Sequence, residues 1–284
     1  PPGGADTTAR LFAAPFQTLL GQPVVVENRP GAGGTIGAAE VARAAPDGTT
    51  LLLDAANQAV APFVLKNIPF DYATAFTPIS RVTIYPLILV VKPESPHRSL
   101  EALLARAKAE PGTLTYSSSG NAVSNHIATV VLLRRAGADM THVPYRGGGP
   151  ALQAVLAGDV DCGFATVASA AALVQDGRLR ALAASSAARI PSLPAVPTVA
   201  EQGFAGYDQV EWNGLYGPAG LPGPAVTRLF ECCRAALADA SVQGRLAGLG
   251  AIGLGTAPAE FDAWLKRERA AMAVVAREAN ITAD

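Results

Sequence analysis

The chain has 284 residues, of which 50% are hydrophobic and 16% charged, and its formal net charge is −1. This composition is that of a globular protein of one large or two medium domains and excludes a disordered chain. A near-zero net charge without a basic patch argues against nucleic acid as a partner. The longest apolar run, residues 84–91, contains Pro86 and is too short to span a bilayer.

Short β-rich runs alternate along the chain with stretches of 3.6-residue hydrophobic periodicity. In chain order the predicted elements are helix 7–20, strand 23–27, helix 35–44, strands 50–54, 76–82 and 87–92, helix 100–110, strand 114–117, helix 125–136, strand 140–143, helix 149–157, strand 162–166, helix 168–176, strands 179–184 and 214–219, and helices 226–238, 241–248 and 258–278. The alternation predicts an α/β fold with mostly parallel sheets flanked by helices.

Two segments rich in proline and glycine are expected to connect domains. The first, 92–96, follows a buried strand, and the second, 212–224, contains GLYGPAGLPGP. We therefore expect residues 1–93 and 213–284 to form a discontinuous domain 1 and residues 94–212 to form domain 2. A ligand cleft is expected between the two domains, because clefts at domain boundaries are common binding sites.

The glycine loop Gly31-x-Gly33-x-x-x-Gly37 lies between a predicted strand and a small-residue helix. Together with Asp54, which closes the next strand, it favours an NAD(P)-dependent oxidoreductase as one hypothesis. However, residues 27–30 separate the strand from the first glycine, and the spacing departs from G-x-G-x-x-G. A structural turn fits the loop better, and no cofactor is expected.

Three other glycine-containing segments each lead into a predicted helix: 1–8, 116–121 and 143–150. Glycines allow positive φ, and a helix N-terminus presents unpaired N–H groups, so such loops can hold a carboxylate or phosphate without a cation. Each loop also has a structural interpretation: Asp6 as a helix cap, a polar turn after the strand at 114–117, and Arg146 as a solvent-exposed charge.

Catalytic motifs are missing from the sequence. It contains no G-x-S-x-G, Walker or H-E-x-x-H pattern and no cysteine and histidine spacing typical of zinc. The histidines, His97, His126 and His142, are not clearly placed near an acid. The sequence therefore predicts binding rather than catalysis, with no enzyme activity and no metal.

Several long motifs resemble one family. VVVENRPGAGGTIGAAEVARAAPDGTTLLL, YSSSGNAVSNH, VPYRGGGPALQAVLAGDVD, GRLRALAASSAARIPSLPAVPTVAEQGF and GLYGPAGLP are similar to the Bug (TctC-type) solute-binding proteins of tripartite tricarboxylate transporters. The resemblance runs in order from Pro1 to Asp284. It implies a periplasmic, two-lobed, type II Venus-flytrap receptor. The family normally carries one more strand before PPGG, so a further N-terminal segment is expected.

By this resemblance, loops of both lobes bind the carboxylate of the ligand. The implied ligand-binding residues are Pro2, Gly3, Gly4, Ala5, Asp6, Ala56, Asn57, Ser117, Ser118, Ser119, Gly120, Asn121, Tyr145, Arg146, Gly147, Gly148, Ala165 and Thr166. Two departures matter. Many relatives have Phe-Asp-Asn where this chain has Phe-Ala165-Thr166, which argues against an amino-acid ligand, and the spacing from PPGG to Asp6 is one residue shorter.

The expected function is that of a periplasmic receptor that captures a small carboxylate for the membrane subunits of a tripartite tricarboxylate-type transporter. A monomer is expected. The alternatives are the NAD(P)-dependent oxidoreductase using Gly31 to Gly37 and an orphan receptor serving a sensor. Dicarboxylates, tricarboxylates, acidic amino acids and aromatic acids all fit a carboxylate clamp, so the sequence leaves the ligand open.

Overall fold

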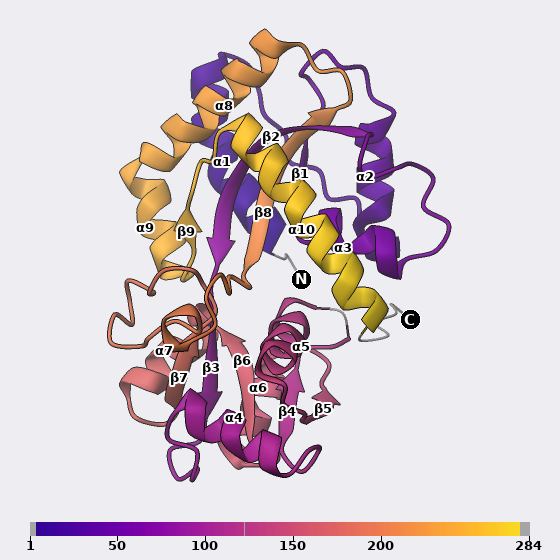
Figure 1. Cartoon of the computed structure of the whole chain (residues 1–284). Coiled ribbons are helices and arrows are strands. Elements are labelled where there is room, and N and C mark those ends of the chain that lie inside the picture. The colour runs from indigo at the N-terminus through magenta and orange to yellow at the C-terminus, as the bar shows by residue number, and fades with distance from the viewer. Residues whose placement is uncertain (1–3, 122, 279–284) are drawn as a thin grey trace. The chain divides into compact units, whose positions relative to one another are not determined.

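The computed structural model describes residues 4–121 and 123–278. Within them the chain forms two compact units, a first unit of residues 4–84 and 212–278 and a second unit of residues 85–211. The chain therefore begins in the first unit, builds the second and returns, as the colours of Figure 1 show. The cleft expected between the domains stays a prediction.

The first unit contains a sheet of strand order β1-β8-β2-β9 with helices around it. Its elements are α1 (Gly4–Leu20), η1 (Ala32–Gly34), α2 (Thr35–Ala42), β1 (Leu52–Asp54), α3 (Asn57–Val64), β2 (Phe76–Tyr85), β8 (Glu211–Pro218), α8 (Gly223–Ala238), α9 (Ala240–Gly248), β9 (Ile252–Gly253) and α10 (Pro258–Glu278). The ladders β1/β8 and β2/β9 are antiparallel. Helix α10 packs along α3, where Arg269 Nε donates to Gln58 O at 3.0 Å.

Aromatic rings fill the core of the first unit beside β8. Phe261 is fully buried, and its ring centroid lies 5.3 Å from that of Tyr216 and 6.2 Å from that of Trp212. Arg81 places its guanidinium 3.8 Å from the ring centroid of Trp264. These contacts join α10 to β8 and β2, so this aromatic cluster holds the C-terminal helix on the sheet.

The second unit contains a sheet of strand order β5-β4-β6-β3-β7. Its elements are β3 (Leu87–Val91), α4 (Leu100–Ala109), β4 (Thr115–Ser118), α5 (Ser124–Ala136), β5 (Thr141–Pro144), α6 (Gly148–Ala157), β6 (Cys162–Thr166), α7 (Val167–Gln175), β7 (Arg180–Ala184) and η2 (Ala200–Gln202). Strand β4 runs parallel to β5 and β6, whereas β3 runs antiparallel to β6 and β7. All five residues of β3 are buried, as its unbroken apolar sequence predicts.

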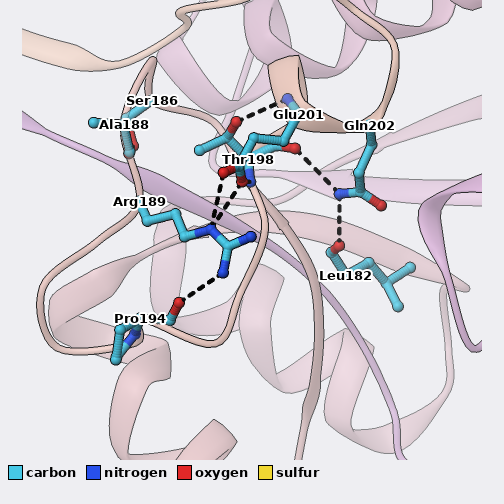
Figure 2. Close-up of polar contacts among 8 residues, drawn as sticks. All are labelled: Leu182, Ser186, Ala188, Arg189, Pro194, Thr198, Glu201 and Gln202. Atoms are coloured by element: carbon cyan, nitrogen blue, oxygen red, sulfur yellow. Dashed lines mark hydrogen bonds and ion pairs between the residues drawn. The ribbon is translucent and has the colours of Figure 1, made fainter.

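The long loop after β7 is held by a polar network (Figure 2). Thr198 N donates to Glu201 Oε2 at 2.7 Å and Glu201 N donates to Thr198 Oγ1 at 3.0 Å, the reciprocal pattern of a capping box. Arg189 Nε adds an ion pair with Glu201 at 2.9 Å. Gln202 Nε2 donates to Leu182 O at 3.1 Å and so fixes the loop against β7.

The α/β class is confirmed, but neither sheet is mostly parallel. The ladders β1/β8 and β2/β9 of the first unit are antiparallel, and the sheet of the second unit is mixed because β3, which enters that unit from the first, runs against both of its neighbours. Residues 23–27 form no strand, and Val25 there is 78% exposed. The sequence did not predict α3, a short helix with Pro62 inside it, or β9, which has only two residues.

The chain enters the second unit earlier than expected. The change from one unit to the other lies between Ile84 and Tyr85, not near residue 93, and the return lies between Glu211 and Trp212. Pro86, between β2 and β3, has no N–H to donate and interrupts the extended chain at this point. The prolines at 93 and 96 instead follow the end of β3 within the second unit.

Candidate ligand-binding site

Three helices of the second unit begin at one edge of its sheet. Strands β4, β5 and β6 are parallel neighbours, and each is followed along the chain by a helix, α5, α6 and α7 respectively. The carboxyl ends of parallel strands lie at the same edge, so the N-termini of these helices gather there (Figure 1). None of the three N-cap residues makes a side-chain capping bond. Their amides and positive dipole ends are therefore available to an anion.

A pocket lies at this edge and is lined entirely by residues of the second unit. The lining combines hydroxyl and amide side chains, apolar side chains, glycine backbone and one carboxyl group. The lining residues are Ser117, Ser119, Asn125, Thr166, Ser169, Gly148, Gly163, Leu87, Val90, Ala151, Leu152, Val155, Phe164, Ala165 and Glu211. The described lining residues include no lysine or arginine, so an anion here would be bound by dipoles and hydrogen bonds.

Asn125 organises the polar part of the pocket. It is buried, and its Oδ1 accepts from Ser119 N at 3.3 Å and from Ser119 Oγ at 3.1 Å. Its Nδ2 donates to Phe164 O at 3.2 Å. This side chain therefore ties the loop after β4 to both α5 and β6, and it fixes the hydroxyl groups before any ligand arrives.

Two glycines shape the pocket for steric reasons. A Cβ on Gly163 would collide with Ser117 Oγ and would lie 3.3 Å from Ser117 O, so only glycine leaves the floor open. Gly147 adopts φ 113°, which side chains disfavour, and its N–H donates to Ser119 O at 3.2 Å. This bond positions the first turn of α6 beside the loop after β4.

A stack of three rings lies next to the loop after β4. The rings of His126 and His142 are parallel within 7° with centroids 4.0 Å apart, and Tyr116 continues the stack 4.9 Å from His142. Ser118 Oγ donates to Gly120 O at 2.7 Å and lies 2.6 Å from His142 Nε2. Ser118 Oγ also accepts from Gly120 N at 3.3 Å, so its contacts hold the loop after β4 in shape.

Burial, followed by the charge of His142, lowers the pKa of His126 to about 4. A histidine whose pKa falls below its ordinary value of about 6.5 on folding destabilises the native state as pH falls from about 6.5 towards 4. We expect His126→Phe to reduce this acid-induced loss of stability by about 1–2 kcal/mol. The expected effect is smaller than the full pKa shift implies, because the ring is only half-buried and solvent screens its charge. Urea unfolding at pH 8 and pH 4.5 tests this, because the pH 8 arm isolates the packing effect. Equal pH slopes for both proteins would contradict it.

The structure places some of the expected second-unit residues in the lining of this pocket and others outside it. Five of them line the pocket: Ser117, Ser119, Gly148, Ala165 and Thr166. Ser118 is instead fully buried against His142, Tyr145 packs on the apolar core, and Asn121 and Arg146 are exposed, and the binding roles of these four residues stay predictions. Gly120 and Gly147 contribute turns with positive φ rather than pocket lining.

The expected first-unit residues occupy the starts of two helices. Pro2 and Gly3 lie outside the described residues, and Gly4, Ala5 and Asp6 form the first turn of α1. Asp6 is therefore inside the helix rather than its N-cap, and the hydrogen bond from Arg10 at 2.9 Å lowers its pKa. Ala56 is the N-cap of α3, and Asn57 begins that helix. The binding roles of these residues stay predictions.

Asp54 does not serve a dinucleotide. Its carboxylate is buried, where it accepts from Gln58 Nε2 at 2.9 Å and from Ala55 N at 2.8 Å, and burial raises its pKa. The strand expected before Gly31 is absent, and residues 32–34 form a single 3₁₀ turn. The βαβ unit on which the oxidoreductase hypothesis depended is therefore not formed.

The sequence did not predict most of the apolar lining of the pocket, nor four further lining residues that carry its polar chemistry or its shape: Asn125, Gly163, Ser169 and Glu211. Asn125 and Ser169 lie within the first turn of the helices that follow two of the loops, so extending each loop by one turn would have included them. Gly163 is the neighbour of Ser117 across the β4/β6 ladder. Glu211 carried no local signal, because it reaches the pocket only through the return of the chain to the first unit.

Two α/β units joined by two crossings, one of them with a polar pocket at the helix N-termini, are the architecture of a periplasmic binding protein. A family model described as "Tripartite tricarboxylate transporter family receptor" (TctC) matches residues 8–252. The chain belongs to this family, and it is a binding protein rather than an enzyme.

Relatives support the same assignment over nearly the whole chain. Protein BugT of Bordetella pertussis is 35% identical over 281 residues, covering 98% of this chain and 86% of BugT. A solved R. palustris structure, "Rpa4515 with adipate", has 32% identity and a TM-score of 0.78, covering 99% of this chain and 94% of that one. MatC from Rhodopseudomonas palustris, solved with bound malate, has 32% identity and a TM-score of 0.75, covering 97% and 95%. The expected two-lobed binding-protein fold is confirmed.

Proposed function

We propose that this chain is a periplasmic receptor that captures a small carboxylate, a di- or tricarboxylate or a related organic acid, for a tripartite tricarboxylate-type transporter. The observation that carries the proposal is the pocket at which three uncapped helix N-termini meet fixed hydroxyl groups. The adipate and malate found with two similar proteins support a carboxylate as the ligand.

The ligand carboxylate is bound at the polar part of the pocket. Its oxygens accept hydrogen bonds from the first-turn amides of α6 and α7 and from the hydroxyls of Ser117, Ser119 and Thr166, all of which line or border the pocket. Apolar side chains such as Leu152 and Phe164 receive the carbon chain. Expulsion of water on binding strengthens each hydrogen bond in the lower dielectric.

The family supports the partners and the location that we propose. In this proposal the receptor works in the periplasm, delivers its ligand to membrane subunits of a tripartite system, and acts as a monomer. In the described part of the chain, no helix combines the length and apolar character that a membrane span requires. A receptor that serves a sensor is the second candidate, and loss of carboxylate uptake on deletion of the gene would favour the transporter.

Asn125→Asp tests the binding site directly. The variant keeps the size of the side chain and its acceptor oxygen, but it places a negative charge beside the bound carboxylate. We expect the affinity for carboxylates in calorimetry to fall by about tenfold or more, since two like charges repel strongly in a partly dehydrated pocket. Gln153→Glu makes the same amide-to-acid change on an exposed position of α6 and serves as the matched control. Equal affinity in both variants would contradict the proposed site.

A further inference from the structure

Glu211 is the one ionisable side chain among the residues that line this pocket in the described part of the chain. It is the first residue of β8 and lies directly before the buried Trp212. No hydrogen bond or ion pair joins its carboxyl group to any described residue. An acid therefore faces a pocket whose other polar groups suit an anion.

The surroundings of Glu211 disfavour an isolated negative charge. Removal from water is the cause of the raised pKa of this carboxyl group, and no charge or hydrogen bond from a described residue offsets that cost. Buried carboxylates in proteins are normally paired with a cation or held by several donors. Among the described residues, no lysine or arginine lines the pocket, so a ligand that carries a cation supplies the partner that Glu211 lacks.

The pocket thus has two chemically different parts. Ser117, Ser119 and Asn125, with the N-termini of α6 and α7, offer donors and positive dipole ends to a carboxylate. Glu211 offers the opposite charge. A ligand that carries both a carboxylate and a cationic group satisfies both parts, whereas a plain dicarboxylate brings a second negative charge into a pocket that already contains an acid.

We propose that Glu211 makes this receptor selective for carboxylates that also carry an ammonium group. Its ligands are then amino acids and other small organic acids with an amino group. The inference rests on the proposed carboxylate site and narrows its ligand. It also reverses one expectation from the sequence. The residues Ala165 and Thr166 argued against an amino-acid ligand because they lack an acid, but Glu211 supplies an acid to the same pocket.

Matched pairs of ligands isolate the ammonium group. Aspartate differs from succinate, and glutamate from glutarate, by one ammonium group on the same carbon chain. Calorimetry on the full chain at pH 7.5 with these four acids is expected to give about tenfold or more tighter binding of the amino member in each pair. In Glu211→Gln, which keeps the size of the side chain and removes its charge, that ratio is expected to fall by about tenfold.

Thermal melting of Glu211→Gln checks that the variant is folded. If it is not folded, the preference of the wild-type protein for the amino member of each ligand pair still tests the inference. Tighter binding of succinate and glutarate than of their amino counterparts overturns the inference and identifies Glu211 as a neutral donor instead. An unchanged ratio in Glu211→Gln overturns it as well. Binding of none of the four acids counts against the proposed carboxylate site itself, whereas equal binding within each pair overturns the selectivity alone.

Discussion

Replacing Gly163 with valine is expected to abolish ligand binding. Any Cβ at this position collides with Ser117 Oγ, and the Cβ would also lie 3.4 Å from Val155 Cγ2. The added methyl groups therefore have to enter the pocket or push β4 away from β6, and either change removes the geometry of the hydroxyls. We expect affinity for carboxylates to fall by about a hundredfold or more, with a stability cost of about 1–3 kcal/mol from overpacking.

The control for Gly163→Val is a glycine-to-valine substitution at a position where a side chain has room. Gly244 lies exposed in α9 of the first unit, and a Cβ there meets nothing within 4 Å. Gly244→Val should bind carboxylates as the wild type does, with stability within about 0.5 kcal/mol of it. Calorimetry and urea unfolding on both variants separate loss of the pocket from loss of the fold. Normal binding by folded Gly163→Val would show that ligands bind elsewhere.

The loops around the pocket could be found from the sequence because their chemistry is local. A strand that ends in serines and a glycine, followed by a helix, predicts an anion-binding turn wherever it occurs. Ser117, Ser119 and Gly148 were found in this way, and the structure places all three at one pocket. Ser118 shows the limit of the same reasoning, since alternation along β4 turns its side chain toward His142 instead.

Sheet topology could not be read from the same local patterns. Strand β3 has the continuous apolar sequence typical of a parallel buried strand, yet it runs antiparallel to both neighbours. A strand buried on both faces looks the same in sequence whichever direction it runs. Its direction is decided by the point at which the chain enters the second unit, near Pro86, and that point depends on pairing between residues far apart in sequence.

Glu211 is the clearest case of a site residue that only tertiary structure reveals. Its neighbours in sequence are strand residues of the first unit, and no glycine or helix start marks it. It reaches the pocket because β8 begins where the chain leaves the second unit. The sequence therefore predicted several of the polar loop residues that line this pocket, but it could not show that an acid lies among them.

Phe261→Ala is expected to have the largest effect on stability, because this side chain is fully buried at the centre of the aromatic cluster. Truncation of a buried phenylalanine costs about 3–5 kcal/mol, since the cavity closes only partly. The lost contacts join α10 to β8. For a protein of this size the melting temperature should fall by about 6–20 °C.

Tryptophan fluorescence is suited to measuring this change, because both tryptophans of the chain, Trp212 and Trp264, belong to the cluster. Phe63→Ala is the matched control: this residue is 42% exposed on α3, so the same truncation should cost less than about 0.5 kcal/mol.

The described residues that line the pocket all belong to the second unit, so Phe261→Ala should still bind carboxylates well below its melting temperature. A loss of stability under about 1 kcal/mol would contradict the role given to the cluster. Loss of binding by the folded variant would instead show that the first unit controls the pocket.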